Sequence, residues 1–161
     1  MKRLTAAFLL LSFSMFGCAG GIKEAKPAPD FSVKLMTGEE VSLAQFKGRP
    51  LVLNFGASWC PHCLHELPIL KETYDKYKGR VEFLSVFVKS PREDVQSLID
   101  KDGVSFKVGF DPDAVAGKAY GVKGIPETFF IDEDGNIVDD YFGGIERSEL
   151  TGKIEMLLKK K

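Results

Sequence analysis

The spacing of apolar residues changes along the chain between the strand period and the helix period. Residues 51–55 form a short apolar run, Leu-Val-Leu-Asn-Phe, which is typical of a strand in the centre of a sheet. In residues 61–77, Leu64, Leu67 and Leu70 recur at a spacing that places them along one side of a helix. A central strand followed directly by a helix indicates an α/β fold.

Turn and capping residues divide the rest of the chain. Ser90-Pro91-Arg92-Glu93 offers an N-cap, a proline in the first turn and a capping-box glutamate, which predicts a helix to about residue 100. Asp111-Pro112 starts another helix by the same logic, whereas Thr37-Gly38 and Asp134-Gly135 indicate hairpin turns. The remaining predicted strands are residues 31–35, 40–43, 81–88, 104–110, 128–131 and 137–142, and a last helix covers residues 146–158. This order predicts a mixed sheet with helices on both faces.

The first residues have the pattern of an export signal. Lys2 and Arg3 precede an apolar run over residues 4–16, which is too short to span a bilayer. The run ends in Met15-Phe16-Gly17-Cys18-Ala19, which resembles a bacterial lipoprotein box, so we expect lipidation of Cys18. The alternative is an incidental cysteine in a signal that is cleaved elsewhere. The predicted organisation is a signal peptide over residues 1–17, a flexible tether over residues 18–29 and one globular domain over residues 30–161.

Composition narrows the function further. The 161 residues, 44% of them apolar and 28% charged, are enough for one domain with a core. The formal charge is −1, and it becomes −3 without residues 1–17 because the basic head is lost. With no basic excess, nucleic acid is not an expected partner.

The segment Trp59-Cys60-Pro61-His62-Cys63 lies between the predicted strand and helix. A helix N-terminus favours a thiolate on Cys60 through its unpaired N–H groups and dipole. Cys63, one turn later, can attack the mixed disulfide that Cys60 forms with a partner. Pro61 fits the first turn, where no N–H donor is needed. The pattern therefore predicts thiol-disulfide exchange with Cys60 as the nucleophile and Cys63 as the resolving thiol.

Two other interpretations of the cysteine pair are less favoured. A zinc site needs further ligands, but near the pair the chain offers only His62, His65 and carboxylates on one short helical segment, which cannot surround an ion tetrahedrally. A purely structural bridge would close a very short loop and remove little chain entropy. We therefore expect no metal.

Several separate segments resemble the TlpA/ResA/CcmG-like thiol-disulfide oxidoreductases over about residues 29–158. They are Pro29-Asp30-Phe31, the run from Asn54 to Cys63, Glu66-Leu67-Pro68 and the run from Gly121 to Phe129. The resemblance implies an α/β thioredoxin-like fold, a mixed central sheet flanked by helices, with a βα element inserted over residues 90–120. It also implies redox chemistry by the cysteine pair without a cofactor, reduction of exported proteins such as apocytochrome c, and a membrane electron donor of the DsbD or CcdA type.

The resemblance also assigns roles to individual residues. Pro126 matches the family's cis-proline, which faces the cysteine pair and lets the backbone of Ile125 pair with a bound peptide. Glu66 and Glu127 match carboxylates near the cysteines, and either could accept the proton of Cys63. Asn54 stands where thioredoxin has a buried aspartate, which makes Glu66 the better acceptor.

The side chains next to the cysteines have simpler expected roles. Trp59 is expected beside the disulfide or packed in the core. His62 and His65 are expected to be exposed, although His62 can tune the thiolate.

Other functions remain open. Pro61-His62 is the pair found in the oxidant DsbA, so an oxidant or isomerase is the first alternative to a reductase. A copper-binding assembly factor of the Sco type uses CxxxC with a distant histidine, whereas this chain has no histidine after His65. A peroxiredoxin needs Thr or Ser where Ala57 stands. A non-catalytic interaction domain is the last alternative. The expected location is periplasmic or otherwise extracytoplasmic, on a membrane anchor.

Overall fold

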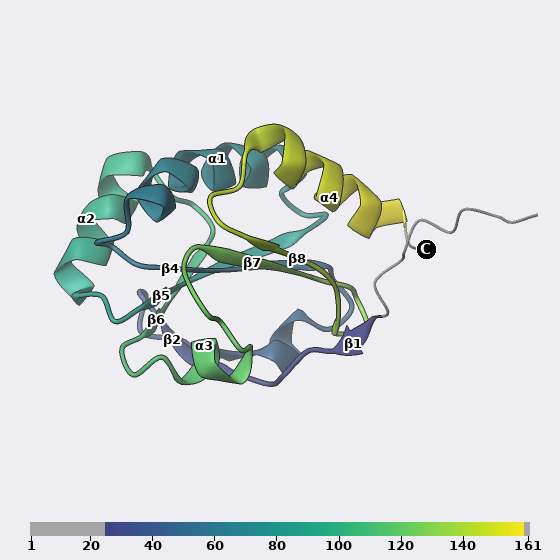
Figure 1. Cartoon of the computed structure of the whole chain (residues 1–161), viewed down its shortest axis with the longest axis horizontal. Helices are drawn as coiled ribbons and strands as arrows, with labels where there is room; N and C mark the ends of the chain where they lie inside the picture. Colours follow the sequence, from purple (N-terminus) through teal and green to yellow (C-terminus); the bar gives the residue numbers. More distant parts are fainter. Residues whose placement is uncertain (1–24, 160–161) are drawn as a thin grey trace, which may run out of the picture.

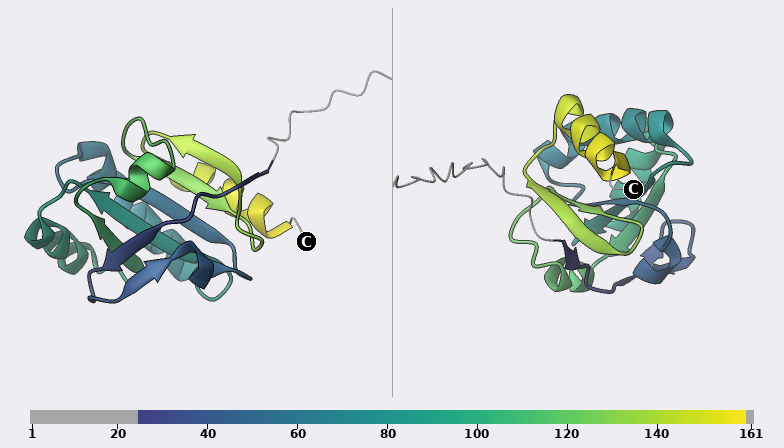
Figure 2. Two further views of the ribbon diagram at one scale, coloured as in Figure 1. Left: turned by 90° about the horizontal axis from the view of Figure 1, so that it is seen from below. Right: turned by 90° about the vertical axis from the view of Figure 1, so that its right-hand side faces the viewer.

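The computed structural model describes residues 25–159, which form one eight-stranded sheet with helices on both faces (Figures 1 and 2). The predicted signal peptide and Cys18 lie outside the described residues. In chain order the elements are β1 (Lys26–Pro27), β2 (Ser32–Leu35), β3 (Glu40–Ser42), a 3-10 turn (Leu43–Phe46), β4 (Leu51–Gly56), α1 (Pro61–Tyr77), β5 (Glu82–Val88), α2 (Arg92–Asp102), β6 (Lys107–Asp111), α3 (Val115–Ala119), β7 (Glu127–Ile131), β8 (Asn136–Phe142) and α4 (Arg147–Lys159).

The sheet is mixed, with the strand order β1-β8-β7-β4-β5-β6-β2-β3. Strands β4, β5 and β6 are parallel to one another, whereas β7 and β2 pair antiparallel to β4 and β6. The predicted mixed sheet and the inserted element are confirmed, since α2, β6 and α3 lie between β5 and β7 in the chain and β6 extends the sheet. Central strand β4 is buried along its whole length, as its apolar run predicts.

Two apolar clusters hold the layers together, one on each face of the sheet. Helices α1, α2 and α4 cover one face, where Leu67, Leu70 and Phe83 are buried. On the other face α3 and the 3-10 turn pack over an aromatic group that includes Phe55 and Tyr120, whose ring centroids lie 5.5 Å apart. Burial of this kind contributes roughly 1.5–3 kcal/mol for each large apolar side chain.

The segment expected to be a flexible tether is partly ordered. Lys26 and Pro27 pair with Ile137 and Asn136 of β8, and the N–H of Ala28 donates to Gly135 O over 2.9 Å. The folded part therefore begins before residue 30. A Gly, Ala, Lys and Pro composition does not reveal this pairing, because a two-residue edge strand has too few positions for a visible alternation.

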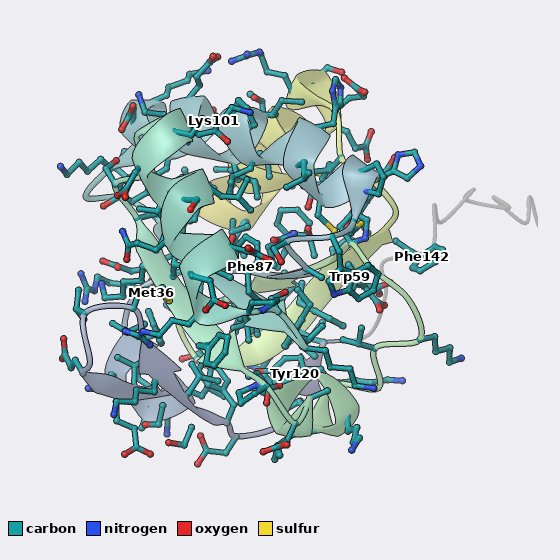
Figure 3. The ribbon with its side chains drawn as sticks, turned by 90° about the vertical axis from the view of Figure 1, so that its left-hand side faces the viewer. Met36, Trp59, Phe87, Lys101, Tyr120 and Phe142 are labelled. Atoms are coloured by element: carbon teal, nitrogen blue, oxygen red, sulfur yellow. The ribbon has the colours of Figure 1, made fainter. Side chains whose placement is uncertain are left out.

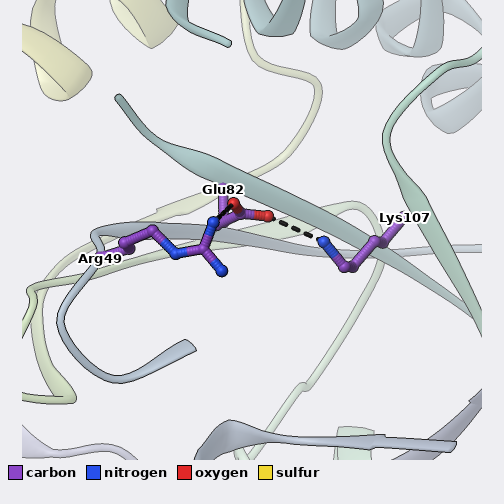
Figure 4. Close-up of polar contacts among 3 residues, drawn as sticks. All are labelled: Arg49, Glu82 and Lys107. Carbon is purple, nitrogen blue, oxygen red and sulfur yellow. Dashed lines mark hydrogen bonds and ion pairs between the residues drawn. The ribbon is translucent and has the colours of Figure 1, made fainter. Parts of the chain in front are cut away.

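Charged side chains form a network at the end of the sheet where β5 begins. Glu82 accepts hydrogen bonds from Arg49, and from Lys107 over 2.9 Å (Figure 4). Glu82 pairs with Leu51 at the start of β4, whereas the cysteine segment follows the end of β4. The two ends of the central strands therefore differ, one with a charged network and the other with the thiols.

No helix within residues 25–159 is long and apolar enough to cross a membrane.

Candidate thiol-disulfide site

The thiol of Cys60 occupies the N-cap of α1. Helix α1 begins at Pro61, and the N–H of Cys63 donates to Cys60 Sγ over 3.3 Å. On its other side Cys60 Sγ lies 3.8 Å from Ile125 O, which can accept the thiol proton. The sulfur therefore has a donor to stabilise its ionised form and an acceptor for its protonated form.

Both thiols are free and lie in a small apolar cluster with Ala57 and Ile125. Cys60 is 5% exposed and Cys63 is 6% exposed, so exposure does not distinguish the two. Burial raises the pKa of the Cys63 thiol far above its ordinary value, and a hydrogen bond with Cys60 and the charge of Glu66 raise it further. Cys63 therefore needs a proton acceptor before it can act as a nucleophile.

Cys63 packs against Gly56, the last residue of β4. A Cβ on Gly56 would lie 3.4 Å from Cys63 Cβ and 3.5 Å from Cys63 Sγ. These are ordinary van der Waals distances, so a methyl group at this position would lie in contact with the Cys63 side chain.

Glu66 is the buried carboxylate of the site. It is 1% exposed, on the helical turn after Cys63. One oxygen, Oε1, accepts from Asn54 Nδ2 over 2.7 Å, and the other, Oε2, accepts from the N–H of Ile145 over 3.0 Å. Burial raises the pKa of Glu66 to about 7, although the donors from Ile145 and Asn54 offset part of this effect. Glu66 can therefore gain or lose a proton near neutral pH.

Two hydroxyl residues that sequence reasoning missed complete this network. Asn54 Nδ2 also donates to Thr128 Oγ1 over 3.1 Å, and Ser85 Oγ donates to Asn54 Oδ1 over 3.2 Å. Strand pairing brings these residues together, since Asn54 is paired in register with Ser85 of β5 and with Thr128 of β7. Only the predicted strand order could have indicated them, because the partners are 31 and 74 positions from Asn54 in the chain.

Ile125 contacts the cysteine pair from the loop before β7, and Pro126 follows it in this loop. The Ile125–Pro126 peptide bond is cis, as the resemblance implies. The side chain of Ile125 packs against the cysteines, and Pro126 O accepts from the N–H of Gly143 over 2.9 Å. This hydrogen bond joins the proline loop to the turn that follows β8.

Glu127 has different surroundings from Glu66. Burial raises the pKa of Glu127, and the charge of Asp140 raises it further. A hydrogen bond with the backbone of Lys123 offsets part of this effect. Glu66, and not Glu127, contributes to the raised pKa of Cys63. Of the two candidate proton acceptors, the arrangement therefore favours Glu66.

Trp59 is exposed over 60% of its surface, and not packed in the core. Its Nε1 donates to Lys89 O over 3.1 Å, while the neighbouring Ser58 N–H donates to Ser90 Oγ over 2.9 Å. Ser90 in turn donates to Val88 O over 3.0 Å. The turn after β5 thus holds the segment that precedes Cys60.

The prediction that Ser90 caps α2 is therefore wrong. The N-cap is Pro91, and no side chain caps the helix. The reason is that the Ser90 hydroxyl already bonds the end of β5 and the cysteine segment, 32 positions away. Local sequence patterns do not include such a distant competitor.

Phe142 is a second exposed aromatic residue at the site that sequence reasoning missed. It is 65% exposed at the end of β8 and opposes Glu127 in register. Its ring covers Gly124, where an added Cβ would lie 2.9 Å from Phe142 Cε2. Figure 3 shows Trp59 and Phe142 on the same side of the molecule.

His62 and His65 are exposed, as expected. A Cβ on Gly144, in the turn after β8, would lie 3.6 Å from His62 Cβ. Within residues 25–159, no three His, Cys, Asp or Glu side chains converge as a group that could hold a metal ion.

The chain is similar to known redox proteins along most of its length. The Redoxin family model matches residues 23–154. The thiol-disulfide oxidoreductase ResA of Bacillus thuringiensis (strain Al Hakam) is 32% identical over 133 residues, which cover 82% of this chain and 77% of that protein.

Solved structures agree with this similarity. A Chlorobium tepidum protein assigned as the thiol:disulfide interchange protein DsbE superposes with a TM-score of 0.78 and 29% identity, over 86% of this chain and 99% of that one. A secreted Mycobacterium tuberculosis disulfide oxidoreductase homologous to E. coli DsbE superposes with a TM-score of 0.70 and 26% identity, over 79% and 96%.

The geometry predicts that Glu66 takes the proton of Cys63 when the mixed disulfide is resolved. Glu66→Gln should slow resolution on the order of 100-fold, because it removes a general base, and should leave formation by Cys60 nearly unchanged. In the unsubstituted protein, resolution should accelerate as pH rises through about 7, where Glu66 ionises, and the variant should lose this inflection. Stopped-flow kinetics on a preformed mixed disulfide would measure both. Glu127→Gln is the matched control, and equal slowing in the two variants would contradict the assignment.

Proposed function

The chain belongs to the Redoxin family and is a thiol-disulfide oxidoreductase of the ResA and DsbE type, and we propose that it reduces disulfides of exported proteins. The observation that carries the proposal is the position of Cys60 Sγ, between the N–H of Cys63 and the carbonyl of Ile125. Cys60 acts as the nucleophile, and Cys63 as the resolving thiol.

The proposed reaction is balanced without a cofactor. The Cys60 thiolate attacks one sulfur of the partner disulfide, which forms a mixed disulfide and releases one partner thiolate. Cys63 gives its proton to Glu66 and attacks Cys60 Sγ, so that the second partner sulfur leaves as a thiolate. Two electrons pass to the partner, and Cys60 and Cys63 become a disulfide.

The surroundings of Cys60 support a protein as the partner. Trp59 and Phe142 leave large aromatic surfaces in solvent beside buried thiols. Exposed aromatic residues of this kind are typical of surfaces that bind polypeptide. Ile125, next to Cys60, is proposed to pair through its backbone with an extended substrate segment, as in the family that this chain resembles.

Apocytochrome c is the proposed substrate class. Its haem is attached at a C-x-x-C-H motif, whose cysteines must be reduced when haem is attached. In an oxidising compartment such a pair becomes a disulfide unless a dedicated reductant acts on it. A membrane thiol transporter of the DsbD or CcdA type is the proposed electron donor, because the reductant has to be recharged.

An extracytoplasmic location, with a lipid anchor on Cys18, is part of the proposal. The charged head and short apolar run of residues 1–16 support export. A similar protein from Mycobacterium tuberculosis is described as secreted. An anchor would keep the domain beside a membrane electron donor.

A second candidate function is disulfide oxidation or isomerisation. The observation that favours it is Pro61-His62, the DsbA pair, with His62 exposed next to the buried Cys60. A strongly stabilised thiolate makes a disulfide oxidising. Copper binding of the Sco type has no such observation among the described residues.

The first prediction of the proposal concerns the trapped partner. In the exporting cell, Cys63→Ser should accumulate a mixed disulfide between Cys60 and an apocytochrome c, because the resolving thiol is absent. Immunoprecipitation without reducing agent, followed by mass spectrometry, would identify the partner. Cys60→Ser is the matched control and should trap nothing. Equal trapping by both variants would contradict the assigned roles, and a partner without a haem-attachment motif would contradict the proposed substrate.

The second prediction concerns direction. We expect a reduction potential nearer that of thioredoxin, about −270 mV, than that of DsbA, about −120 mV. Equilibration of the purified protein with glutathione and its disulfide would measure it. His62→Ala should lower the potential further if His62 stabilises the thiolate. A measured potential above about −180 mV would make the protein an oxidant or isomerase.

The third prediction concerns the anchor. Cys18→Ser should abolish incorporation of labelled fatty acid and release the protein from the membrane fraction, because the lipid acceptor is lost. Cys60→Ser and Cys63→Ser, which also remove one thiol each, should stay labelled. Unchanged labelling of the Cys18→Ser protein would exclude lipidation at this residue.

A further inference from the structure

The side-chain amide of Asn54 lies at the centre of the polar network below the cysteines. Its two N–H groups donate to Glu66 Oε1 and Thr128 Oγ1, and its oxygen accepts from Ser85 Oγ. All of these side chains are buried, with Thr128 and Ser85 exposed over 0% and 1% of their surface. An unmatched group here is costly because no bulk water can replace the lost partner.

This orientation of the amide suits the ionised form of Glu66 better than a form that is protonated on Oε1. An ionised carboxylate accepts hydrogen bonds and donates none, so the N–H end of Asn54 must face it. If Glu66 carries a proton on Oε1, the carboxyl group becomes a donor that points at another donor. The conflict is removed when the amide turns by 180° and presents Oδ1 to Glu66.

The two neighbours of Asn54 permit this turn. Ser85 and Thr128 are hydroxyl residues, and a hydroxyl can donate or accept by rotating its hydrogen. After the turn, Thr128 would donate to Oδ1, and Ser85 would accept from one N–H, while the other N–H would lose its partner. The other donor to Glu66 is the backbone N–H of Ile145, which cannot reverse. Asn54 is therefore the partner of Glu66 that can adapt to its charge.

We propose that the amide of Asn54 reverses when Glu66 takes up the proton of Cys63, and that Ser85 and Thr128 are positioning residues that set the balance between the two orientations. The inference rests on the proposed role of Glu66 as the proton acceptor for Cys63. The proton moves from Cys63 Sγ to the Glu66 carboxylate, and no other reactant is needed.

The two hydroxyls have opposite effects on this balance. With the Thr128 hydroxyl, the orientation that suits ionised Glu66 matches both N–H groups, whereas the reversed amide matches only one. Without this hydroxyl, each orientation leaves one N–H unmatched, so the advantage of the first orientation is lost. Without the Ser85 hydroxyl, the reversed amide has both N–H groups unmatched, whereas the present orientation loses only a donor to Oδ1. Because an unmatched N–H is tolerated less well than an unmatched carbonyl, Thr128 favours the ionised form of Glu66 and Ser85 favours the protonated form.

The other charged groups near Glu66 have partners of their own. On its own helix, Cys63 is the ionisable group whose pKa responds to Glu66. Arg147 and Lys153 of α4 form ion pairs with other carboxylates. Glu127, at the start of β7, interacts with Lys123 and Asp140. The pKa of Glu66 is set by burial and by its two N–H donors.

The test is the titration of Glu66 in the purified, reduced full chain, followed by NMR of ¹³C-labelled glutamate carboxyls, with Glu66→Gln to assign the signal. Thr128→Val should raise the pKa of Glu66 by about one pH unit, and Ser85→Ala should lower it by about half a unit. Thr73→Val is the matched control, because Thr73 is a buried threonine of α1 whose hydroxyl has no hydrogen-bond partner. It should leave the titration unchanged.

Thr128→Ser keeps the hydroxyl, so Glu66 should titrate in this variant as in the unsubstituted protein. This comparison with Thr128→Val distinguishes the loss of a hydrogen bond from a general loss of structure. Shifts of the same sign in Thr128→Val and Ser85→Ala, or shifts no larger than that of Thr73→Val, would overturn the inference. The titration uses no substrate, so this failure would leave the proposed reductase function intact. Failure of the proposed function would appear instead as absent disulfide exchange in the unsubstituted protein.

Discussion

The site depends on one constraint, which is that only four residues separate the end of β4 from the start of α1. This short connection puts Cys60 at the N-cap, where its sulfur accepts a hydrogen bond from the N–H of Cys63. In most helices a hydroxyl, amide or carboxylate oxygen is the acceptor at this position. It also brings Cys63 onto the bare backbone of Gly56. The same connection thus gives the two thiols unequal surroundings, although both are buried.

In the proposed reaction the buried Cys63 thiol needs a base, and the sheet supports the buried carboxylate that is proposed for this role. Glu66 is on the next turn of α1, but its hydrogen-bond donors come from β4 and from the turn before α4. The turn is fixed to the proline loop through the bond between Gly143 and Pro126. Elements far apart in sequence therefore converge on one carboxylate, which keeps it ionisable near neutral pH despite its burial.

The sequence revealed those parts of the molecule whose causes are local. The bounds of α1 and the core of β4 were predictable because apolar spacing and Pro61 determine them. Ser85 and Thr128 were not predictable, since it is the strand register that brings them to Asn54. The position of Phe142 was not predictable either, because its ring packs against Gly124 in a different loop. The capping pattern at Ser90 was misleading because a tertiary partner competes for the same hydroxyl. The importance of Pro126 came from family resemblance alone.

The surroundings of Cys63 bear on the direction of electron flow. A disulfide is strongly oxidising when the protein stabilises the reduced, ionised form, as in DsbA. Here burial and the charge of Glu66 both oppose ionisation of Cys63, so the reduced pair retains a proton there. The reduced state gains little electrostatic stabilisation at this thiol, which makes it a better electron donor. Pro61 and His62 are exposed, and water weakens the effect of a charge at such a position. The buried half of the site therefore supports the proposed direction, which is reduction of a partner.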